Sequence, residues 1–282
     1  MVQIITDTTS CLPIDFANKY HIPVIPQVIN FGNESFYEGV NLDNAGFMAR
    51  LVKSNELPKT AAPPPELFSK EFLRLAPRNE PILCIHPSAE VSGTVRSAII
   101  AAQEFPNVDI RVIDTRVVGS PLCTMVQLAA EWAAEGCDAD TIESRLKHMS
   151  AHCQVYFLVA TLEYLQRGGR IGGAQALLGS VLQIRPILCL NNGSVDRFES
   201  ERTHKRALNR LKEIVVEKCP SDGGAYLSVM HAGVPEEAQE LANELGKLVN
   251  QPNVLICDVP PAIVTHGGPG ILAASFFTHA IV

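Results

Sequence analysis

The sequence predicts an α/β protein with two domains, a parallel-sheet α/β layer in the first half and a mixed or antiparallel α/β layer in the second. Short, wholly apolar segments such as residues 82–85 are typical of strands in a parallel sheet that is covered on both faces. Apolar residues with helical spacing lie between these segments, which indicates a doubly wound layer. The second half instead carries an Asn192-Gly193 turn signal between two apolar runs, which predicts a hairpin. A chain of 282 residues is long enough for two such layers.

The first half alternates expected strands with expected helices. Strands are expected at residues 2–7, 22–31, 82–85 and 110–113, and helices from near residue 66, after Gly93 and around residues 122–129. Polar residues stand at the ends of three of these strands: Asp7, His86 and Asp114. Because the carboxyl ends of parallel strands meet at one edge of a sheet, we expect these residues to gather there, with Ser92 nearby.

The second half has a different order of expected elements. Strands are expected at residues 155–161, 186–190, 195–198, 225–230, 254–257 and 262–265, and amphipathic helices at residues 207–215 and 238–248. This order predicts a sheet that is at least partly antiparallel. It also places the boundary near residues 150–156, so we expect domains at residues 1–153 and 154–282.

Composition argues against several functional classes. A formal net charge of −7 and a pI near 5.6 argue against nucleic acid as a partner, because binding to nucleic acid usually needs a basic face. No apolar run approaches the roughly 20 residues of a membrane span, and the first residues indicate a strand rather than a signal peptide. We therefore expect a cytoplasmic protein.

Neither a metal nor a cofactor is expected. The eight cysteines include no Cys-x-x-Cys pair, so we expect reduced thiols that act as small hydrophobic residues. His148, His152 and Cys153 form the only tight cluster, and their spacing is poor for zinc. The run from Gly268 to Ala273 matches a dinucleotide pattern, but too little chain follows it for the required βαβ unit.

Ser92-Gly93-Thr94 is the first candidate site, because it precedes an expected helix. The simplest interpretation is an N-cap, in which the hydroxyl groups accept hydrogen bonds from backbone N–H groups. The same geometry also suits an anion, since a helix N-terminus presents free N–H groups and a positive dipole end. Both interpretations remain open from these residues alone.

His266 is the second candidate, in a glycine-rich turn that we expect to follow a strand. Glycine lets a ligand approach the backbone closely, so His266 is either a ligand-contacting residue or a structural one. Arg167, Arg170, Arg202, Lys205 and Arg206 form two basic clusters, which are either solvated surface or a contact for phosphate or an acidic partner. Ser92 and His266, oriented by Asp7 or Asp114, would make an acyl-ester hydrolase, although Ser92 lacks a Gly-x-Ser-x-Gly elbow.

These motifs, in their order along the chain, resemble the DegV family. The matching segments are Asp7-Thr8-Thr9-Ser10, the segment from Thr60, Val91-Ser92-Gly93-Thr94, Asp114-Thr115, Thr161 to Leu165 with Gly168-Gly169-Arg170-Ile171, Arg185-Pro186-Ile187-Leu188, and His266 with Gly268-Pro269-Gly270. The segment that ends in Gly168-Gly169-Arg170-Ile171 is the most specific to the family. The resemblance spans essentially the whole chain.

The resemblance implies a bacterial, FakB-like fatty-acid-binding subunit of a fatty acid kinase, with the lipid between or adjoining two α/β domains. It implies a binding subunit rather than an enzyme, because a separate ATP-dependent kinase phosphorylates the bound acid to an acyl phosphate for phospholipid synthesis. Transient contact with a membrane is compatible with this role. The alternatives are the hydrolase described above and a carrier of another apolar acid that has no kinase partner.

The resemblance also assigns roles to individual residues. Ser92 and the Thr60 loop, including the Ala61 backbone, would bind the carboxylate, and the Gly93 and Thr94 N–H groups would assist. His266 would lie beside the head group, and Arg170 and Arg202 would face the kinase or the phosphoryl group. The chain departs from the family pattern at Ala61, Ala62 and Pro64, which removes side-chain groups that would bind the carboxylate.

Overall fold

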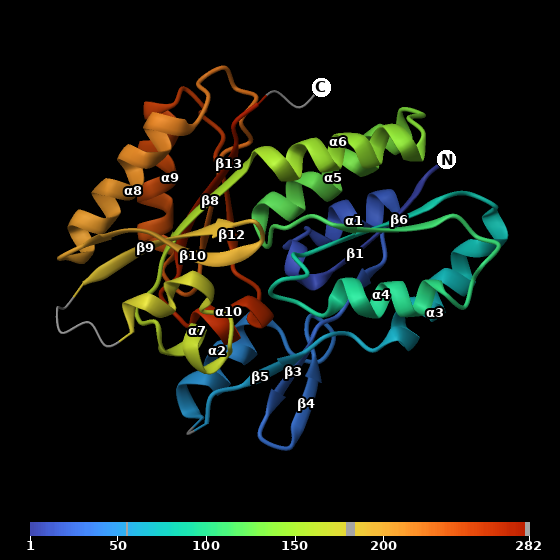
Figure 1. Ribbon diagram of the computed structural model, residues 1–282, viewed down its shortest axis with the longest axis horizontal. Coiled ribbons are helices and arrows are strands. Elements are labelled where there is room, and N and C mark those ends of the chain that lie inside the picture. The colour runs from blue at the N-terminus through green and yellow to red at the C-terminus, as the bar shows by residue number, and fades with distance from the viewer. Residues whose placement is uncertain (55, 179–183, 280–282) are drawn as a thin grey trace. The chain divides into compact units, whose positions relative to one another are not determined.

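The computed structural model describes residues 1–54, 56–178 and 184–279 (Figure 1). The chain divides into two compact units, Met1–Ser150 and Ala151–Val282. The α/β fold class expected from the sequence is confirmed in both units, because each contains a sheet of the expected kind with helices packed against it.

The first unit is built on a parallel sheet of four strands in the order β2-β1-β6-β7. These strands are β1 (Gln3–Asp7), β2 (Val24–Ile25), β6 (Ile82–His86) and β7 (Ile110–Asp114). Every residue of β6 is buried, as expected for a central strand that is covered on both faces. The carboxyl ends of β1 and β6 therefore open onto the same edge of the sheet.

Helices cover both faces of this sheet, and Figure 1 shows α4 and α5 on opposite sides of it. The helices of the unit are α1 (Ile14–Tyr20), α2 (Asn44–Lys53), α3 (Pro65–Leu75), α4 (Thr94–Ala102), α5 (Ser120–Ala134) and α6 (Ala139–His152), with short 3₁₀ turns at Thr8–Ser10 and Ala76–Arg78. Phe68 and Phe72 of α3 pack with Ala98 of α4 onto Ile5 and Ile82 of the sheet. This packing fixes the start of α4 next to the strand ends.

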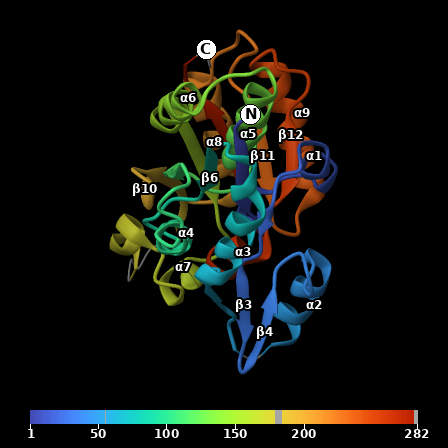
Figure 2. The same ribbon diagram turned by 90° about the vertical axis from the view of Figure 1, so that its right-hand side faces the viewer.

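The expected strand at residues 22–31 is wrong as a single element. Pro26 and Gln27 separate β2 from β3 (Val28–Phe31), which joins a small antiparallel sheet with β4 (Glu34–Tyr37) and β5 (Lys59–Ala61) in the order β4-β3-β5 (Figure 2). Proline lacks an N–H group, so it does not continue a hydrogen-bonded ladder through the middle of a sheet. The break turns the chain and places Gln27 between the two sheets.

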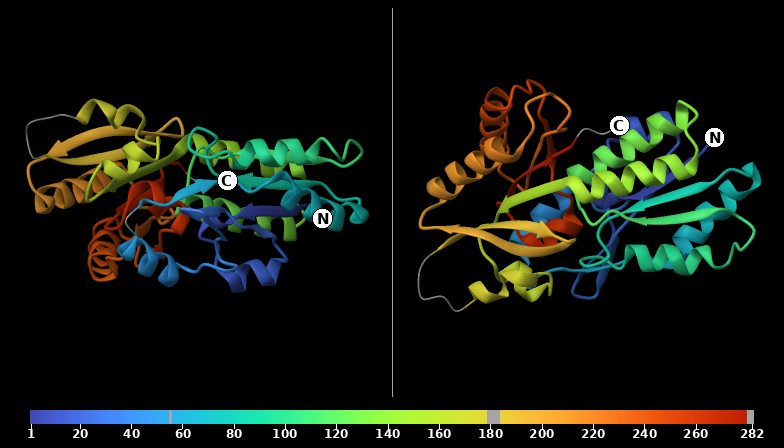
Figure 3. Two further views of the ribbon diagram at one scale, coloured as in Figure 1. Left: turned by 90° about the horizontal axis from the view of Figure 1, so that it is seen from below. Right: turned by 45° about the horizontal axis from the view of Figure 1, so that its top comes forward.

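The second unit is built on six strands in the order β10-β9-β8-β13-β11-β12, all antiparallel except the β11–β12 pair. The strands are β8 (Cys153–Leu158), β9 (Arg185–Asn191), β10 (Ser194–Glu201), β11 (Ser228–His231), β12 (Leu255–Asp258) and β13 (Leu272–Phe277). The expected hairpin at Asn192-Gly193 is the β9–β10 pair, and Figure 3 shows it from two further sides.

Two long helices, α8 (His204–Lys218) and α9 (Pro235–Leu248), pack against this sheet, as their apolar spacing predicts. Leu211 of α8 and Leu241 of α9 meet Leu272 and Phe276 of β13 in one hydrophobic core. The shorter α7 (Glu163–Arg167), α10 (Pro261–Gly267) and a 3₁₀ turn at Gly172–Leu177 complete the unit.

The expected strand at residues 262–265 is wrong, because this segment is the helix α10. Pro261 stands in the first helical turn, where its fixed φ and missing N–H are tolerated, and Thr265 donates a hydrogen bond from Oγ1 to the Pro261 carbonyl at 2.9 Å. The strand lies further along at β13, whose residues are all buried. A short apolar run alone does not distinguish a strand from a buried helix.

The described part of the chain contains no helix that is both long and apolar enough to cross a membrane. The cysteines are free thiols, of which Cys84, Cys123 and Cys219 are buried and the others are half-buried. Burial raises the pKa of Cys189 to about 11 and that of Cys219 to about 12, so these groups are protonated at neutral pH.

Candidate functional site

The polar strand ends of the first unit meet at one edge of the parallel sheet, as expected. Asp7 ends β1 and His86 ends β6, and His86 Nδ1 lies 2.7 Å from Asp7 Oδ2. Both side chains are fully buried. At the neighbouring strand, Thr115 donates from Oγ1 to the His86 carbonyl at 2.7 Å, and Asp114 Oδ1 accepts from the Ala89 N–H at 3.2 Å.

Asp7 is the centre of a buried hydrogen-bond network. Its Oδ1 accepts from the Thr9 N–H at 3.0 Å and from Thr9 Oγ1 at 2.6 Å. Gln27 donates from Nε2 to the same oxygen at 3.0 Å and to Thr94 Oγ1 at 2.8 Å. A charged carboxylate is costly to bury unless it is paired and hydrogen-bonded, and these donors meet that condition.

Ser92 stands at the outer end of this network, at the start of α4. Its Oγ lies 2.7 Å from Thr94 Oγ1 and accepts from the Thr94 N–H at 3.2 Å. Thr94 is fully buried, whereas Ser92 is half-buried and Gly93 is exposed. The N-cap position of α4 is Gly93, which makes no side-chain capping bond, so the expected cap by a hydroxyl group is wrong at that position. The Ser92 hydroxyl stands one residue before it and is the half-buried end of a buried polar chain.

The Thr60 segment lies against the same turn. Thr60 and Ala61 belong to β5, where Thr60 is paired with Ile29 of β3. A Cβ added to Gly93 would lie 3.1 Å from the Ala62 Cβ, so the two loops touch. The structure thus brings Thr60, Ala61, Ser92, Gly93 and Thr94 to one place in the first unit.

His266 and Arg170 form a second cluster, which belongs to the second unit. His266 lies in the last turn of α10 and is half-buried. Burial, and after it the positive charge of Arg170, lower the pKa of His266 from 6.5 to about 4. The imidazole is therefore neutral at neutral pH and offers one donor and one acceptor nitrogen.

Glycines make this second cluster possible. A Cβ at Gly168 would overlap the His266 ring, and it would lie 3.0 Å from the Tyr164 carbonyl oxygen. Gly268 has a φ of +79°, and a Cβ there would overlap the Tyr164 ring. Arg170 donates to the Gly168 carbonyl at 2.7 Å, which closes the turn after α7. Arg202 is exposed between β10 and α8.

The hydrolase arrangement of Ser92 and His266, oriented by Asp7 or Asp114, stays a prediction, and within the first unit Asp7 has another imidazole beside it. The imidazole that Asp7 holds is that of His86. Within the first unit, Ser92 Oγ contacts the hydroxyl and N–H groups of Thr94.

No group of three His, Cys, Asp or Glu residues in the described part of the chain could hold a metal ion. His148 and His152 lie on α6, and Cys153 begins β8.

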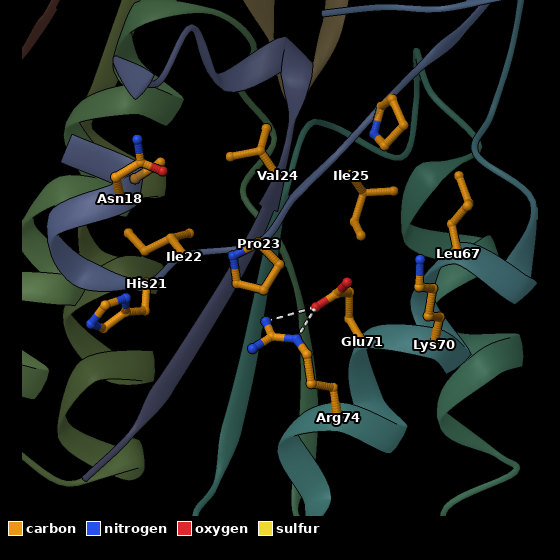
Figure 4. Close-up of a pocket in the computed structure, with 12 residues that line it drawn as sticks. Asn18, His21, Ile22, Pro23, Val24, Ile25, Leu67, Lys70, Glu71 and Arg74 are labelled. Atoms are coloured by element: carbon orange, nitrogen blue, oxygen red, sulfur yellow. Dashed lines mark hydrogen bonds and ion pairs between the residues drawn. The ribbon is translucent and has the colours of Figure 1, made fainter. Parts of the chain in front are cut away.

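A surface pocket of about 430 Å³ lies in the first unit, along the end of α1, β2 and α3 (Figure 4). Arg74 is paired with Glu71 at its wall, where Nη2 and Oε2 are 2.7 Å apart. None of the residues singled out from the sequence lines this pocket.

Gln27 is the residue that sequence reasoning missed. A lone glutamine inside an apolar run gave no signal of its own. The proline that precedes it marked a break in the strand, and a polar residue at such a break lies near a sheet edge.

The comparison with known families identifies the chain. A family model described as "Uncharacterised protein, DegV family" matches residues 1–279. The chain belongs to the DegV family. A DegV domain-containing protein of Halalkalibacterium halodurans is 34% identical over 277 residues, covering 98% of each chain. Protein DegV of Bacillus subtilis is 31% identical over 272 residues, which is 96% of this chain and 97% of that protein.

Solved structures of DegV-family proteins share the fold. The fatty acid binding DegV family protein of Streptococcus agalactiae matches with a TM-score of 0.91 and 29% identity. DegV of Bacillus subtilis, a fatty acid binding protein, matches with a TM-score of 0.89 and 30% identity. In both cases the match covers 99% of each chain. The family expected from the motifs is therefore confirmed.

Proposed function

We propose that this DegV-family protein binds a long-chain fatty acid and holds its carboxylate at Ser92. The observation that carries the proposal is the half-buried Ser92 hydroxyl, which ends a buried hydrogen-bond chain at the start of α4. The fatty acid binding by DegV proteins of similar structure supports the lipid as ligand.

The physical chemistry of a fatty acid fits such a site. Burying about 14 methylene groups contributes roughly 11 kcal/mol before the costs of association, and several kcal/mol are lost to ordering. The acyl chain thus supplies the affinity. The carboxylate must keep hydrogen bonds when it leaves water, and the Ser92 hydroxyl and the free N–H groups of the first turn of α4 provide donors.

The Thr60 segment is proposed to complete the carboxylate contacts. Ala62, which directly follows Thr60 and Ala61, lies beside Gly93, and this contact supports a role for the segment. Ala61 and Ala62 have no side-chain donors, which leaves backbone groups to do what hydroxyl and amide groups do in the family pattern. We expect weaker head-group binding than in relatives that carry those side chains.

The second unit is proposed to serve the transfer of the ligand. We propose that a separate ATP-dependent kinase phosphorylates the bound acid, that Arg170 and Arg202 face this kinase or the phosphoryl group, and that the chain itself needs no cofactor. For His266 we propose a neutral hydrogen-bonding group, because a pKa of about 4 keeps its imidazole uncharged. Its predicted contact with the head group stays a prediction.

The first experiment is native and denaturing mass spectrometry of the purified protein. We expect a bound fatty acid, of 14 to 18 carbons by the family resemblance, that is lost on denaturation. Ser92→Ala should weaken binding about tenfold, since one hydrogen bond to a charged group is removed. Ser150→Ala is the matched control, because it also removes one half-buried hydroxyl, which donates to the Thr115 carbonyl at 2.5 Å. Equal affinities for both variants would remove Ser92 from the site, and a covalent acyl adduct would indicate the hydrolase instead.

The kinase role has its own test. The purified protein loaded with fatty acid is mixed with a bacterial fatty acid kinase subunit and ATP, and acyl phosphate is measured. Arg202→Ala should keep fatty acid affinity and slow phosphorylation, because Arg202 is an exposed cation on the surface. Normal phosphorylation by this variant and by Arg170→Ala would contradict the assignment.

A further inference from the structure

The orientation of the hydrogen bonds behind Ser92 follows from the charge of one residue, Asp7. A carboxylate only accepts hydrogen bonds. Its partners are the N–H and hydroxyl of Thr9, the amide of Gln27 and the ring of His86, all of which can donate. Because His86 Nδ1 faces Asp7 Oδ2, this nitrogen carries a proton. Asp7 therefore determines the direction of every hydrogen bond around it.

The side chain of Gln27 links Asp7 to Thr94 and fixes the direction of the hydrogen bond to Thr94. Its side chain is buried, and the nitrogen that faces Asp7 is 3.0 Å from Oδ1 and 2.8 Å from Thr94 Oγ1. The flipped amide would point its carbonyl oxygen at a carboxylate, which is repulsive, so the NH₂ group takes this position. Its two hydrogens are then used by Asp7 and Thr94.

The hydroxyl proton of Thr94 has a hydrogen-bond acceptor in one direction only. Thr94 Oγ1 accepts from Gln27, and within the described residues the acceptor for its proton is Ser92 Oγ at 2.7 Å. The opposite direction would leave the Thr94 proton unpaired in a fully buried position. The hydroxyl of Thr94 therefore donates to Ser92.

The consequence is that Ser92 presents a donor. Its Oγ accepts from the Thr94 hydroxyl at 2.7 Å and from the Thr94 N–H at 3.2 Å, which occupies both lone pairs. This half-buried hydroxyl can then form one further hydrogen bond, in which it donates its own proton. A head group that only accepts hydrogen bonds fits such a group better than one that also donates.

We infer that Gln27 is a specificity-determining positioning residue, which orients the Ser92 hydroxyl as a donor and so favours carboxylates over alcohols. This inference rests on the proposed function of fatty acid binding. Gln27 acts through Thr94 and Ser92 and does not itself touch the ligand. Without its amide, the hydroxyls of Thr94 and Ser92 can reverse, and Ser92 can then accept a hydrogen bond from an alcohol.

The test compares palmitic acid with 1-hexadecanol, which share a chain and differ in the head group. The variant Gln27→Met keeps the length of the side chain and removes its donors. We expect it to lower the preference for the acid over the alcohol about tenfold, the usual effect of one hydrogen bond. Thr9→Val is the matched control, because it removes a hydrogen bond from the same Asp7 oxygen and leaves Gln27 and Thr94 in contact. It should keep the wild-type preference within about twofold.

A second pair of variants keeps the inference testable if Gln27→Met does not fold. Thr94→Val interrupts the chain of hydrogen bonds, and Thr94→Ser retains the hydroxyl, so only the first should lower the preference for the acid. The inference is overturned if Gln27→Met keeps the wild-type preference for the acid over the alcohol. If Gln27→Met does not fold, the same result in Thr94→Val overturns it. It is also overturned if Thr9→Val loses as much of this preference as Gln27→Met.

A measurement on the ligand-free protein separates this inference from the proposed function. The side-chain amide of Gln27, identified by the two N–H signals that Gln27→Met lacks, should exchange slowly with deuterium because both hydrogens are bonded and buried. Fast exchange would overturn the orientation of the chain. If the wild-type protein binds neither ligand, the proposed function fails and the inferred specificity fails with it, while slow exchange still shows that the Gln27 amide donates within the buried network.

Discussion

Replacing Asp7 by alanine should be among the most destabilising changes in the first unit. The carboxylate is fully buried and accepts four hydrogen bonds, two from Thr9, one from Gln27 and one from His86. Alanine removes all four acceptor contacts at once and leaves these buried donors with nothing in place of the carboxylate.

The magnitude follows from the cost of leaving buried polar groups unpaired. Each buried polar group left unpaired typically costs about 1–3 kcal/mol, and Asp7→Ala leaves several donors without a partner, so we expect a loss of about 4 kcal/mol in the free energy of unfolding. Asp7→Asn keeps one acceptor oxygen and loses the charge that faces His86. We expect it to cost about half as much, roughly 2 kcal/mol.

The assay is urea unfolding followed by tryptophan fluorescence. The chain has one tryptophan, Trp132 on α5, which is buried and reports on the first unit. The matched control is Asp43→Ala, which removes an exposed N-cap bond from Asp43 Oδ1 to the Gly46 N–H at 2.7 Å. Loss of an N-cap hydrogen bond of this kind lowers the free energy of unfolding by about 1 kcal/mol.

The ranking of the three variants decides the outcome. We expect Asp7→Ala to lose the most stability, Asp7→Asn less, and Asp43→Ala least. If Asp7→Ala lost no more than Asp43→Ala, the buried carboxylate would not hold the strand ends together. The account of the network around Asp7, and of the hydroxyl orientation that depends on it, would then be refuted.

Three further predictions concern the second unit. Gly168→Ala should lower the free energy of unfolding by about 1–3 kcal/mol, because its Cβ would overlap the His266 ring. Gly224→Ala is the control and should lower it less, because its Cβ has one ordinary contact, at 3.4 Å. Thermal unfolding followed by circular dichroism compares the two variants. Lowering the pH from 6.5 to about 4 should reduce stability by up to about 3 kcal/mol through His266, since the unfolded imidazole gains a proton that the folded one does not. His266→Asn should flatten this part of the profile, and an unchanged profile would contradict the low pKa of His266. Burial raises the pKa of Cys189 to about 11 and that of Cys219 to about 12. At pH 8 these thiols should therefore react with a thiolate-specific reagent far more slowly in the folded protein than in urea. Equal rates would contradict their burial.

Much of the architecture could be predicted because it is written in local patterns. The apolar runs at β6 and β7 and the Asn192-Gly193 turn each specify an element by spacing or turn chemistry, without help from distant residues. The predictions failed where that information is ambiguous. Residues 262–265 have no period that separates a buried helix from a strand, and Pro26 divides the apolar run at residues 22–31 into two strands.

The sequence by itself determined the fold class and the family, and it predicted the Ser92 turn as a candidate site, because short motifs carry that information. Only the tertiary structure decided which side chains stand behind Ser92. Asp7, Gln27 and Thr94 are separated by 20 and 67 residues along the chain, and they meet because strand ends and a helix start share one edge of the sheet. Hydrogen bonds depend on distance and direction in space, and a linear pattern of residues does not contain either.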